Sequence, residues 1–364
     1  MRPDLTTTGK RAGAFKGRRA SALAAAAATV AAVAVAGCGG SSDTTSSANA
    51  TTPAASKGGT QLSLVAYSTP SSAYAKLIAA YEQTPAGKGV SFTTSFGPSG
   101  TQSRAVAAGQ PADVVNFSLT ADVTRLVKAG LVAANWDAGP TRGIVTDSVV
   151  AFGVRPGNPK HITSWADLTK PGVKVITPNP FTSGASRWNI VAAYGAQLKL
   201  GKTPAQAQAY LQALLKNVVT QPSAASAALQ TFASGEGDVV LDYEDDLIHA
   251  KKKGIGLDYV VPAQTVLIEN PIAVTVKSAH AGQAQAFVNW LESPTGQALW
   301  AKEGYRPVLP SVAAQFKSTF AQPAKLFTIA YLGGWTAVTT KFFDPTAGIV
   351  TKLEQQQGVS TATG

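Results

Sequence analysis

Three short segments of the sequence share a composition that suits anion binding. They read FGPSGTQSRAV at 96–106, NPFTSGASRWN at 179–189 and QPSAASAALQTF at 221–232. In each, a proline is followed by small or hydroxyl residues and then by a helical pattern. The first turn of a helix has backbone N–H groups without internal partners, and small residues let a ligand approach them. Three such helix starts facing one site would bind an anion without a cationic side chain.

A serine or threonine at a single helix start is usually only an N-cap, so the threefold recurrence is what points to a ligand. The sequence offers little for catalysis. A nucleophilic serine needs a nearby base, but His161, His249 and His280 lie in loop-like or basic contexts, and no G-x-S-x-G motif occurs. We therefore predict that the protein is not an enzyme.

Metal binding also lacks a signal, because no two histidines are close in the sequence. The acidic cluster is DYEDD at 242–246, which we interpret as a strand end followed by the negative charges of a helix start. We predict no metal site and no cofactor, with a cation site at this cluster as the less favoured alternative.

The elements that would position these segments alternate between strands and helices. LSLVAY, VSFTTSF and ADVVNF have strand patterns. Tyr74, Leu77, Ile78 and Tyr81 form one stripe of an amphipathic helix between the first two strands, and RAVAAG predicts a helix that ends at Gly109. This β-α-β-α-β order predicts a parallel sheet covered by helices.

A second set of elements follows in the same style. VVAFGV, VKVITP, GDVVLDY, DYVVP and IAVTV predict strands, and helices are expected near 186–198, 204–215 and 224–233, with a late helix around 287–291. In open α/β sheets, ligands bind at the carboxyl ends of strands, next to helix starts. The three segments occupy such junctions.

The N-terminal residues predict secretion. Residues 1–37 combine a cationic start with the apolar run ALAAAAATVAAVAVA, which is too short for a membrane span and is typical of a signal peptide. Cys38 follows VAG directly, as in a bacterial lipoprotein signal, so we expect it to be lipidated. Residues 38–60 contain no large apolar side chain and predict a flexible tether.

The composition of the chain limits its fold class and its partners. With 364 residues, of which 45% are hydrophobic and 14% charged, about two globular domains are expected. Cys38 is the only cysteine, which excludes an internal disulfide. Because residues 1–37 carry six basic and one acidic residue, their removal would lower the net charge from +11 to +6. Lys251–Lys253 resemble a solvated helix end, and we predict no nucleic-acid binding.

Longer motifs resemble the bacterial sulfate-binding proteins of ABC importers from Leu62 to about Phe343. They are VKVITPNPFTSGASRWNIVAAYGA, ADVVNFSLTADV, VRPGNPKHITSWADLTKPG, SPTGQALW and YRP, in the family's order. The resemblance implies a two-lobed α/β fold, the type II periplasmic-binding-protein fold, with the ligand in a cleft between lobes. It further implies a monomer that delivers sulfate to ABC permease subunits.

That family holds its dehydrated dianion with helix-start amides, serine hydroxyls and an indole N–H. Carried over by motif, the ligand-binding positions are Ser99, Ser183, Gly184, Ala185, Ala225 and Tyr243, and the supporting or interlobe positions are Arg187, Ser68 and Gly100. Amide dipoles can neutralise the anion, so we expect Arg187 to act outside the direct contacts.

Three positions depart from the family pattern. Ala185 replaces the second glycine of SGGARWN, the third segment lacks the arginine of Gly-Ala-Arg, and Tyr243 replaces the tryptophan of W-E-N-E. A phenol donates like an indole but can also accept, and a buried acceptor favours a protonated anion. Asp242 is a candidate acceptor, although strand alternation predicts that it faces away if Tyr243 faces the cleft. Sulfate is the first expectation; thiosulfate, phosphate or another tetrahedral oxyanion are the alternatives.

By the same resemblance, lobe 1 comprises residues 60–143 and 264–325, lobe 2 comprises 144–263, and residues 326–364 form a C-terminal helical extension that packs on the body. The expected location is extracytoplasmic, anchored to the cell membrane by the lipid. Two functions of other classes remain open at this point: a secreted ester hydrolase, and a lipoprotein that senses the anion rather than importing it.

Overall fold

The computed structural model describes residues 59–363, so the predicted signal peptide and Cys38 lie outside the described residues. The strands are β1 (Thr60–Tyr67), β2 (Val90–Gly97), β3 (Val114–Asn116), β4 (Ile144–Val154), β5 (Val175–Ile176), β6 (Val218–Thr220), β7 (Val239–Tyr243), β8 (Asp258–Val260), β9 (Gln264–Val274) and β10 (Lys325–Phe327). They form one mixed sheet whose main path runs β2-β1-β3-β9-β4-β7-β5-β6.

Helices cover this sheet. They are α1 (Ser71–Glu82), α2 (Ser99–Ala107), α3 (Thr120–Lys128), α4 (Gly184–Lys199), α5 (Pro204–Lys216), α6 (Ala225–Ala233), α7 (Glu244–Lys252), α8 (Ala281–Glu292), α9 (Pro294–Lys302), α10 (Pro310–Gln315), α11 (Gly334–Phe343) and α12 (Ile349–Gln356), with 3₁₀ turns η1 (Trp165–Thr169) and η2 (Ile329–Leu332). Among residues 59–363, no helix is long and apolar enough to span a membrane.

The sheet has two parts, which we call the first half (β1, β2, β3 with α1, α2, α3, α8 and α9) and the second half (β5, β6, β7, β8 with α4 to α7). In the first half β1 pairs in parallel with both β2 and β3, as the β-α-β-α-β pattern predicts. In the second half β5 pairs in parallel with β6 and β7. The predicted α/β class is confirmed.

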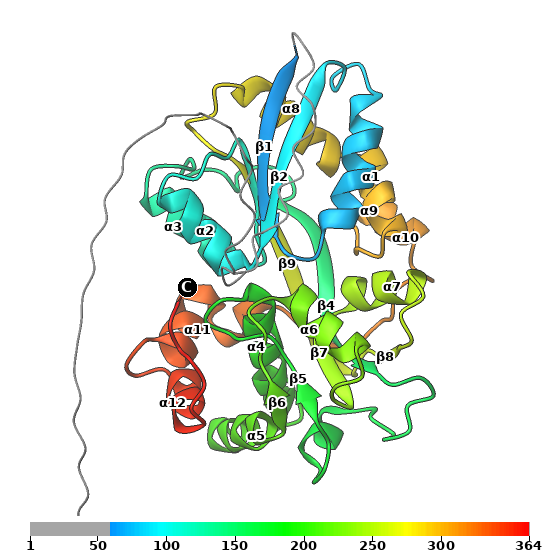
Figure 1. Cartoon of the computed structure of the whole chain (residues 1–364), viewed down its shortest axis with the longest axis vertical. Helices are drawn as coiled ribbons and strands as arrows, with labels where there is room; N and C mark the ends of the chain where they lie inside the picture. The colour runs from blue at the N-terminus through cyan, green and yellow to red at the C-terminus, as the bar shows by residue number, and fades with distance from the viewer. Residues whose placement is uncertain (1–58, 364) are drawn as a thin grey trace, which may run out of the picture. The chain divides into compact units, whose positions relative to one another are not determined.

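Two long strands, β4 and β9, connect the halves (Figure 1). The start of β4 pairs antiparallel with β9, and from Val150 onward β4 pairs with β7 instead. The end of β9 pairs with β3. The register of β4 shifts between Ile144 and Thr146, directly after Arg142 and Gly143, which both have positive φ. Positive φ is strained for a residue such as Arg142.

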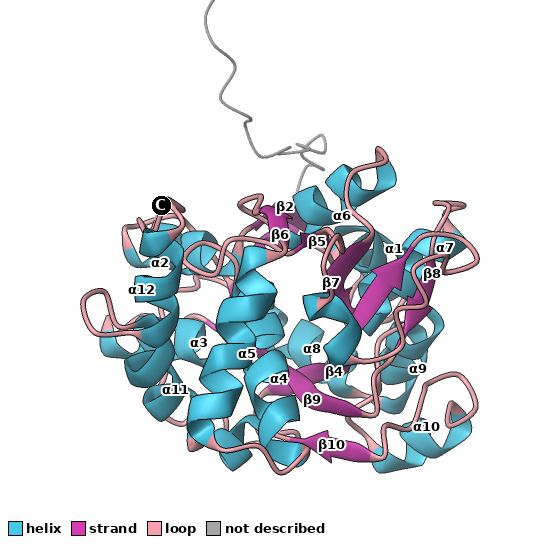
Figure 2. Cartoon of the chain, turned by 90° about the horizontal axis from the view of Figure 1, so that it is seen from below, coloured by secondary structure: helices cyan, strands magenta, loops and turns pink. Residues whose placement is uncertain are grey.

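Each half has its own core. Tyr74, Phe287 and Trp300 belong to the buried cluster of the first half, whereas Trp165 and Trp188 belong to the large cluster of the second. Helices α4 and α5 pack side by side, and α11 and α12 pack near them (Figure 2). The Trp335 ring of α11 meets the Trp188 ring of α4 edge-on, with centroids 4.6 Å apart. The C-terminal helices thus lie on the second half.

Candidate anion-binding site

Helices α2, α4 and α6 begin at the three segments that the sequence indicated. Their N-cap residues are Pro98, Ser183 and Ala224, and no cap side chain accepts a hydrogen bond from the first turn. Alanine at an N-cap costs about 0.5–2 kcal/mol of stability relative to serine, threonine, asparagine or aspartate. The first-turn amides are therefore not used by their own caps, as anion binding requires.

The starts of α4 and α6 are tied together by the loops that precede them. The Thr182 hydroxyl donates to the carbonyl of Ser223 at 2.8 Å, and the amide of Asn179 donates to the carbonyl of Pro222 at 2.8 Å. The Asn179 side chain accepts from the amide of Phe181 at 2.8 Å, which shapes the turn before α4. Strand β5 ends just before this turn, so the sheet edge sets its position.

The start of α4 lies against the first half of the molecule. A Cβ atom on Gly184 would stand 2.5 Å from the Ser118 Cβ and 3.1 Å from the Leu119 Cγ, so only glycine permits this approach. A Cβ on Gly100 would stand 3.2 Å from the Thr182 carbonyl oxygen. A cavity of about 10 Å³ lies here between α2, α3 and α4, and Gly100, Ser183 and Gly184 are among its lining residues. The structure thus brings these predicted residues together.

Ser118 is the residue at this junction that the sequence interpretation missed. Its amide donates to the Ser99 hydroxyl at 3.0 Å, and its carbonyl accepts from the Trp188 indole nitrogen at 2.7 Å. The Ser99 hydroxyl donates in turn to Asp122 at 2.7 Å, so it would have to leave Asp122 to reach an anion. Ser118 lies two residues after the end of strand β3, and this place near a strand's carboxyl end is the sequence signal that could have found it.

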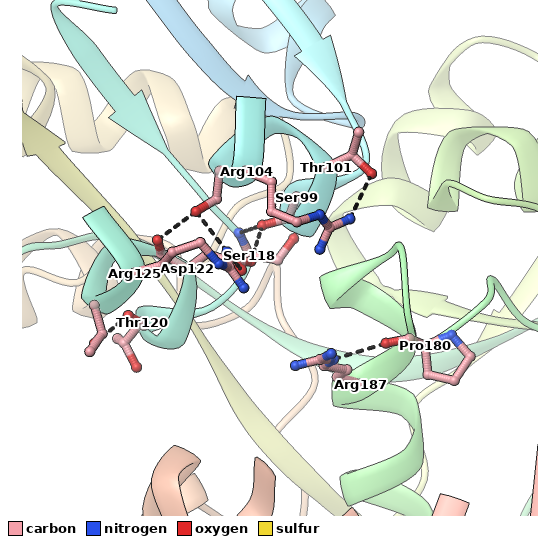
Figure 3. A network of polar contacts seen from close by, with 11 residues as sticks. Ser99, Thr101, Arg104, Ser118, Thr120, Asp122, Arg125, Pro180 and Arg187 are labelled. Atoms are coloured by element: carbon pink, nitrogen blue, oxygen red, sulfur yellow. Dashed lines mark hydrogen bonds and ion pairs between the residues drawn. The ribbon is translucent and has the colours of Figure 1, made fainter. Parts of the chain in front are cut away.

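Three arginines surround the small cavity, and Figure 3 shows what they contact. Arg125 donates to Asp122 at 2.7 Å, and Arg104 donates to Thr101 at 3.2 Å. Arg187 donates through Nε to the Pro180 carbonyl at 2.8 Å and lies over the Phe343 ring at 4.7 Å. Burial lowers the pKa of Arg187, and Arg125 and Arg104 add to this by repulsion, whereas Asp122 opposes it.

Tyr243, the last residue of β7, is fully buried. Its ring centroid is 6.4 Å from that of Tyr67, at the end of β1 in the first half. Ser118 lies near its phenol, although the two oxygens make no hydrogen bond of proper geometry. Burial raises the pKa of Tyr243, so the phenol stays neutral and can donate.

The acidic run that follows spans a strand end and a helix start, as predicted. Strand β7 ends at Tyr243 and α7 begins at Glu244, and the side chains of Asp245 and Asp246 are buried. Burial also raises the pKa of Asp242 to about 7. Asp242 accepts from the Tyr243 amide at 2.9 Å. Tyr243 packs in one buried cluster and Val240 in another, so Asp242 lies on the opposite strand face from Tyr243, as alternation predicts.

The other predicted ligand-binding and supporting positions lie at helix starts and at a strand end. Ala185 sits in the first turn of α4 and is absent from the residues with positive φ, so its amide is presented as a glycine's would be. Ala225, the first residue of α6, is buried, and Ser68 is half-buried directly after β1. Within residues 59–363 no group of histidine, cysteine and carboxylate side chains could hold a metal ion.

Comparison with known proteins places this architecture. Residues 62–306 match the family model described as bacterial extracellular solute-binding protein. The chain is 40% identical over 301 residues to a sulfate-binding protein of Synechococcus elongatus, covering 79% of this chain and 86% of that one. It is 32% identical over 274 residues to a thiosulfate-binding protein of Pseudomonas aeruginosa, covering 72% and 82%.

A solved structure is also similar. The sulfate-binding protein SubI from Mycobacterium tuberculosis H37Rv is 45% identical and superposes with a TM-score of 0.77, over 78% of this chain and 100% of that chain. The fold is thus the two-lobed α/β fold of periplasmic binding proteins, as the sequence predicts.

Proposed function

This chain belongs to the bacterial extracellular solute-binding proteins, within the group of sulfate-binding proteins, and we propose that it captures sulfate between its two halves and delivers it to an ABC importer. The observation that carries the proposal is the convergence of the α2 and α4 starts at one small cavity, with α6 tied to α4 by its loop. Relatives named for sulfate and a solved structure of the same name support the choice of anion.

The anion is held by neutral donors. The amides of Gly184, Ala185 and Ala225 start two helices whose caps leave them unoccupied, and their dipoles place partial positive charge at the site. The Ser183 hydroxyl and the neutral Tyr243 phenol add two donors. Because sulfate is acceptor-only near neutral pH, a set of neutral groups that can all donate suits it.

Arg187 supports the site without touching the anion. Its Nε is used by the Pro180 carbonyl, and its guanidinium plane lies on Phe343. These contacts fix the loop that precedes the α4 start, and they leave direct neutralisation of the anion to amide dipoles.

Binding requires the halves to separate and close again. The present cavity of about 10 Å³ holds about one water, so an anion enters only when α4 moves away from Ser118. Lobe 1 is residues 60–143 and 264–325, and lobe 2 is 144–263. Strands β4 and β9 join them, and the strained start of β4 at Arg142–Gly143 is the first crossing. The C-terminal extension, 326–364, packs on lobe 2 through Trp335.

The protein works outside the cytoplasm as a lipid-anchored monomer, held to the membrane through Cys38 after removal of residues 1–37. Thiosulfate is the second candidate ligand, since a thiosulfate-binding relative covers 72% of this chain. Phosphate fits less well, because its proton needs a buried acceptor in the site.

Calorimetric titration of the purified protein with sulfate, thiosulfate and phosphate tests the function. We expect one-to-one binding of sulfate. Ser183→Ala should weaken it by about 1–3 kcal/mol, because one ligand oxygen loses its donor. Ser234→Ala is the matched control: its hydroxyl donates to Thr231 at the far end of α6, so affinity should not change. Absence of sulfate binding, or equal affinities of both variants, would contradict the proposal.

A further inference from the structure

Five buried side chains form a group at the junction of the halves, which we call the Asp–Tyr cluster: Tyr67, Asp242, Tyr243, Asp245 and Asp246. Tyr67 comes from the end of β1 in the first half, and the other four come from β7 and the first turn of α7 in the second. All five are at most 5% exposed. The cluster lies where the halves meet: the ring centroids of Tyr67 and Tyr243 are 6.4 Å apart, and Thr69, just after β1, lies beside Asp246.

The cluster contains many polar atoms without hydrogen-bond partners. They are the phenol oxygens of Tyr67 and Tyr243, both carboxyl oxygens of Asp245, and one carboxyl oxygen each of Asp242 and Asp246. The hydroxyls of Ser148 and Thr69, which lie near Asp245 and Asp246, are unpartnered too. Unpaired buried polar atoms are costly and mark a place where a ligand or a proton is missing.

Among residues 59–363, no lysine, arginine or histidine forms an ion pair with the carboxyls of the cluster. Arg306 donates instead to Glu244 at 2.7 Å. Burial, followed by the charge of Asp246, raises the pKa of Asp245, and burial, followed by the charge of Asp242, raises that of Asp246. Three carboxylates cannot be ionised together in such surroundings.

We propose that Asp245 and Asp246 are neutral carboxylic acids whenever the halves are closed, so that capture of the oxyanion takes up protons. The proposal deepens the proposed function and rests on it. A carboxylic acid can donate a hydrogen bond, whereas a carboxylate only accepts and would repel the dianion. The protonated pair therefore makes the surroundings of Tyr243 compatible with sulfate, and these two residues become determinants of affinity.

The sign of the pH dependence follows from the two states. With the halves apart, the carboxyls are solvated and ionise near the ordinary aspartate pKa of about 3.9. In the closed state their pKa values are raised, and a bound dianion raises them further. At pH values between the open-state and closed-state pKa values, closure binds protons. Sulfate affinity therefore falls as pH rises, by up to about tenfold per pH unit for each proton taken up.

Other titratable groups surround the cluster and must be separated from it. Tyr74 and Tyr305 face Tyr67, and both phenols stay neutral because burial raises their pKa. His249 on α7 contacts Ser72 at 2.6 Å and lies 3.9 Å from Glu303. Burial lowers the pKa of His249, and Lys253 adds to this by repulsion. On β4, burial, with Glu269, raises the pKa of Asp147.

The test is a calorimetric titration with sodium sulfate at pH 5.5, 6.5, 7.5 and 8.5, each in two buffers of different ionisation enthalpy. We expect the affinity to fall at least tenfold across this range, and the buffer dependence of the heat to show net proton uptake. A flat pH profile with no proton uptake overturns the proposal, and this measurement needs no variant. Failure to bind sulfate at every pH would instead contradict the proposed function.

Variants assign the protons. In Asp245→Asn/Asp246→Asn, amides replace the carboxyls at nearly equal volume, so proton uptake should fall and the pH profile should flatten. His249→Gln and Asp147→Asn are matched controls on α7 and β4 and should keep the wild-type profile. An unchanged profile in the double variant, with its fold verified by thermal unfolding, would refute the assignment to Asp245 and Asp246.

Discussion

Gly184→Ala should weaken sulfate binding without harming the fold. An added Cβ would stand 2.5 Å from the Ser118 Cβ and 3.1 Å from the Leu119 Cγ, whereas ordinary contacts lie at 3.4–4 Å. The start of α4 must therefore stay roughly 1 Å farther from the loop after β3. Overpacking of this kind costs about 1–3 kcal/mol. Because only the closed state contains the contact, the cost appears as a loss of affinity of about 5- to 150-fold.

The assay combines calorimetry with thermal unfolding of the sulfate-free protein. Gly184 is the first residue of α4, and alanine is a better helix former than glycine. In the sulfate-free protein the halves can separate and relieve the contact, so the midpoint temperature of unfolding should not fall. Gly282→Ala is the neutral control, because nothing lies within 4 Å of its added Cβ. Gly195→Ala is the contrasting control, since its Cβ would stand 2.3 Å from the Phe327 ring, which belongs to the large cluster of the second half, and should lower the midpoint.

Two results would refute this reasoning. Unchanged affinity of Gly184→Ala would mean that closure does not bring α4 against Ser118. A fall in its unfolding midpoint as large as that of Gly195→Ala would mean that the contact belongs to the fold itself and not to a closing motion.

Further predictions concern the phenol and the anchor. Tyr243→Phe should weaken sulfate binding by about 1–3 kcal/mol because a donor is lost. Tyr243→Trp should keep sulfate binding and should bind phosphate more weakly than the wild type, since an indole cannot accept. Titrations with both anions check this, and unchanged affinities in both variants would mean that Tyr243 only packs. Cys38→Ser should release the protein from membranes at unchanged affinity, as measured by fractionation and titration; a variant that stays anchored would contradict lipidation.

Much of the fold could be predicted because its signals are local. The stripe of Tyr74, Leu77 and Tyr81 predicts α1, and these residues are buried in the first half. The anion segments likewise contain the starts of α2, α4 and α6, although α2 begins five residues before the predicted helical run RAVAAG. Strand β5 is shorter than VKVITP indicates, because Pro178 has no N–H to donate and the chain turns there.

What could not be predicted depends on contacts between distant residues. The switch of β4 from β9 to β7 brings together strands about 100 residues apart, and no local pattern indicates it. Ser118 acquires its role only because Ser99 and Trp188 meet it in space. The burial of Asp245 could not be predicted for the same reason: charges at a helix start are usually solvated, and here the carboxyl is fully buried by the folded chain.

A crystal structure of the protein with sulfate would test most directly whether neutral donors hold the anion. We predict a sulfate at the starts of α2, α4 and α6, bonded to the amides of Gly184, Ala185 and Ala225 and to the Ser183 hydroxyl, with Arg187 still on the Pro180 carbonyl. A sulfate bonded directly to the guanidinium groups of Arg104, Arg125 or Arg187, away from these amides, would contradict it.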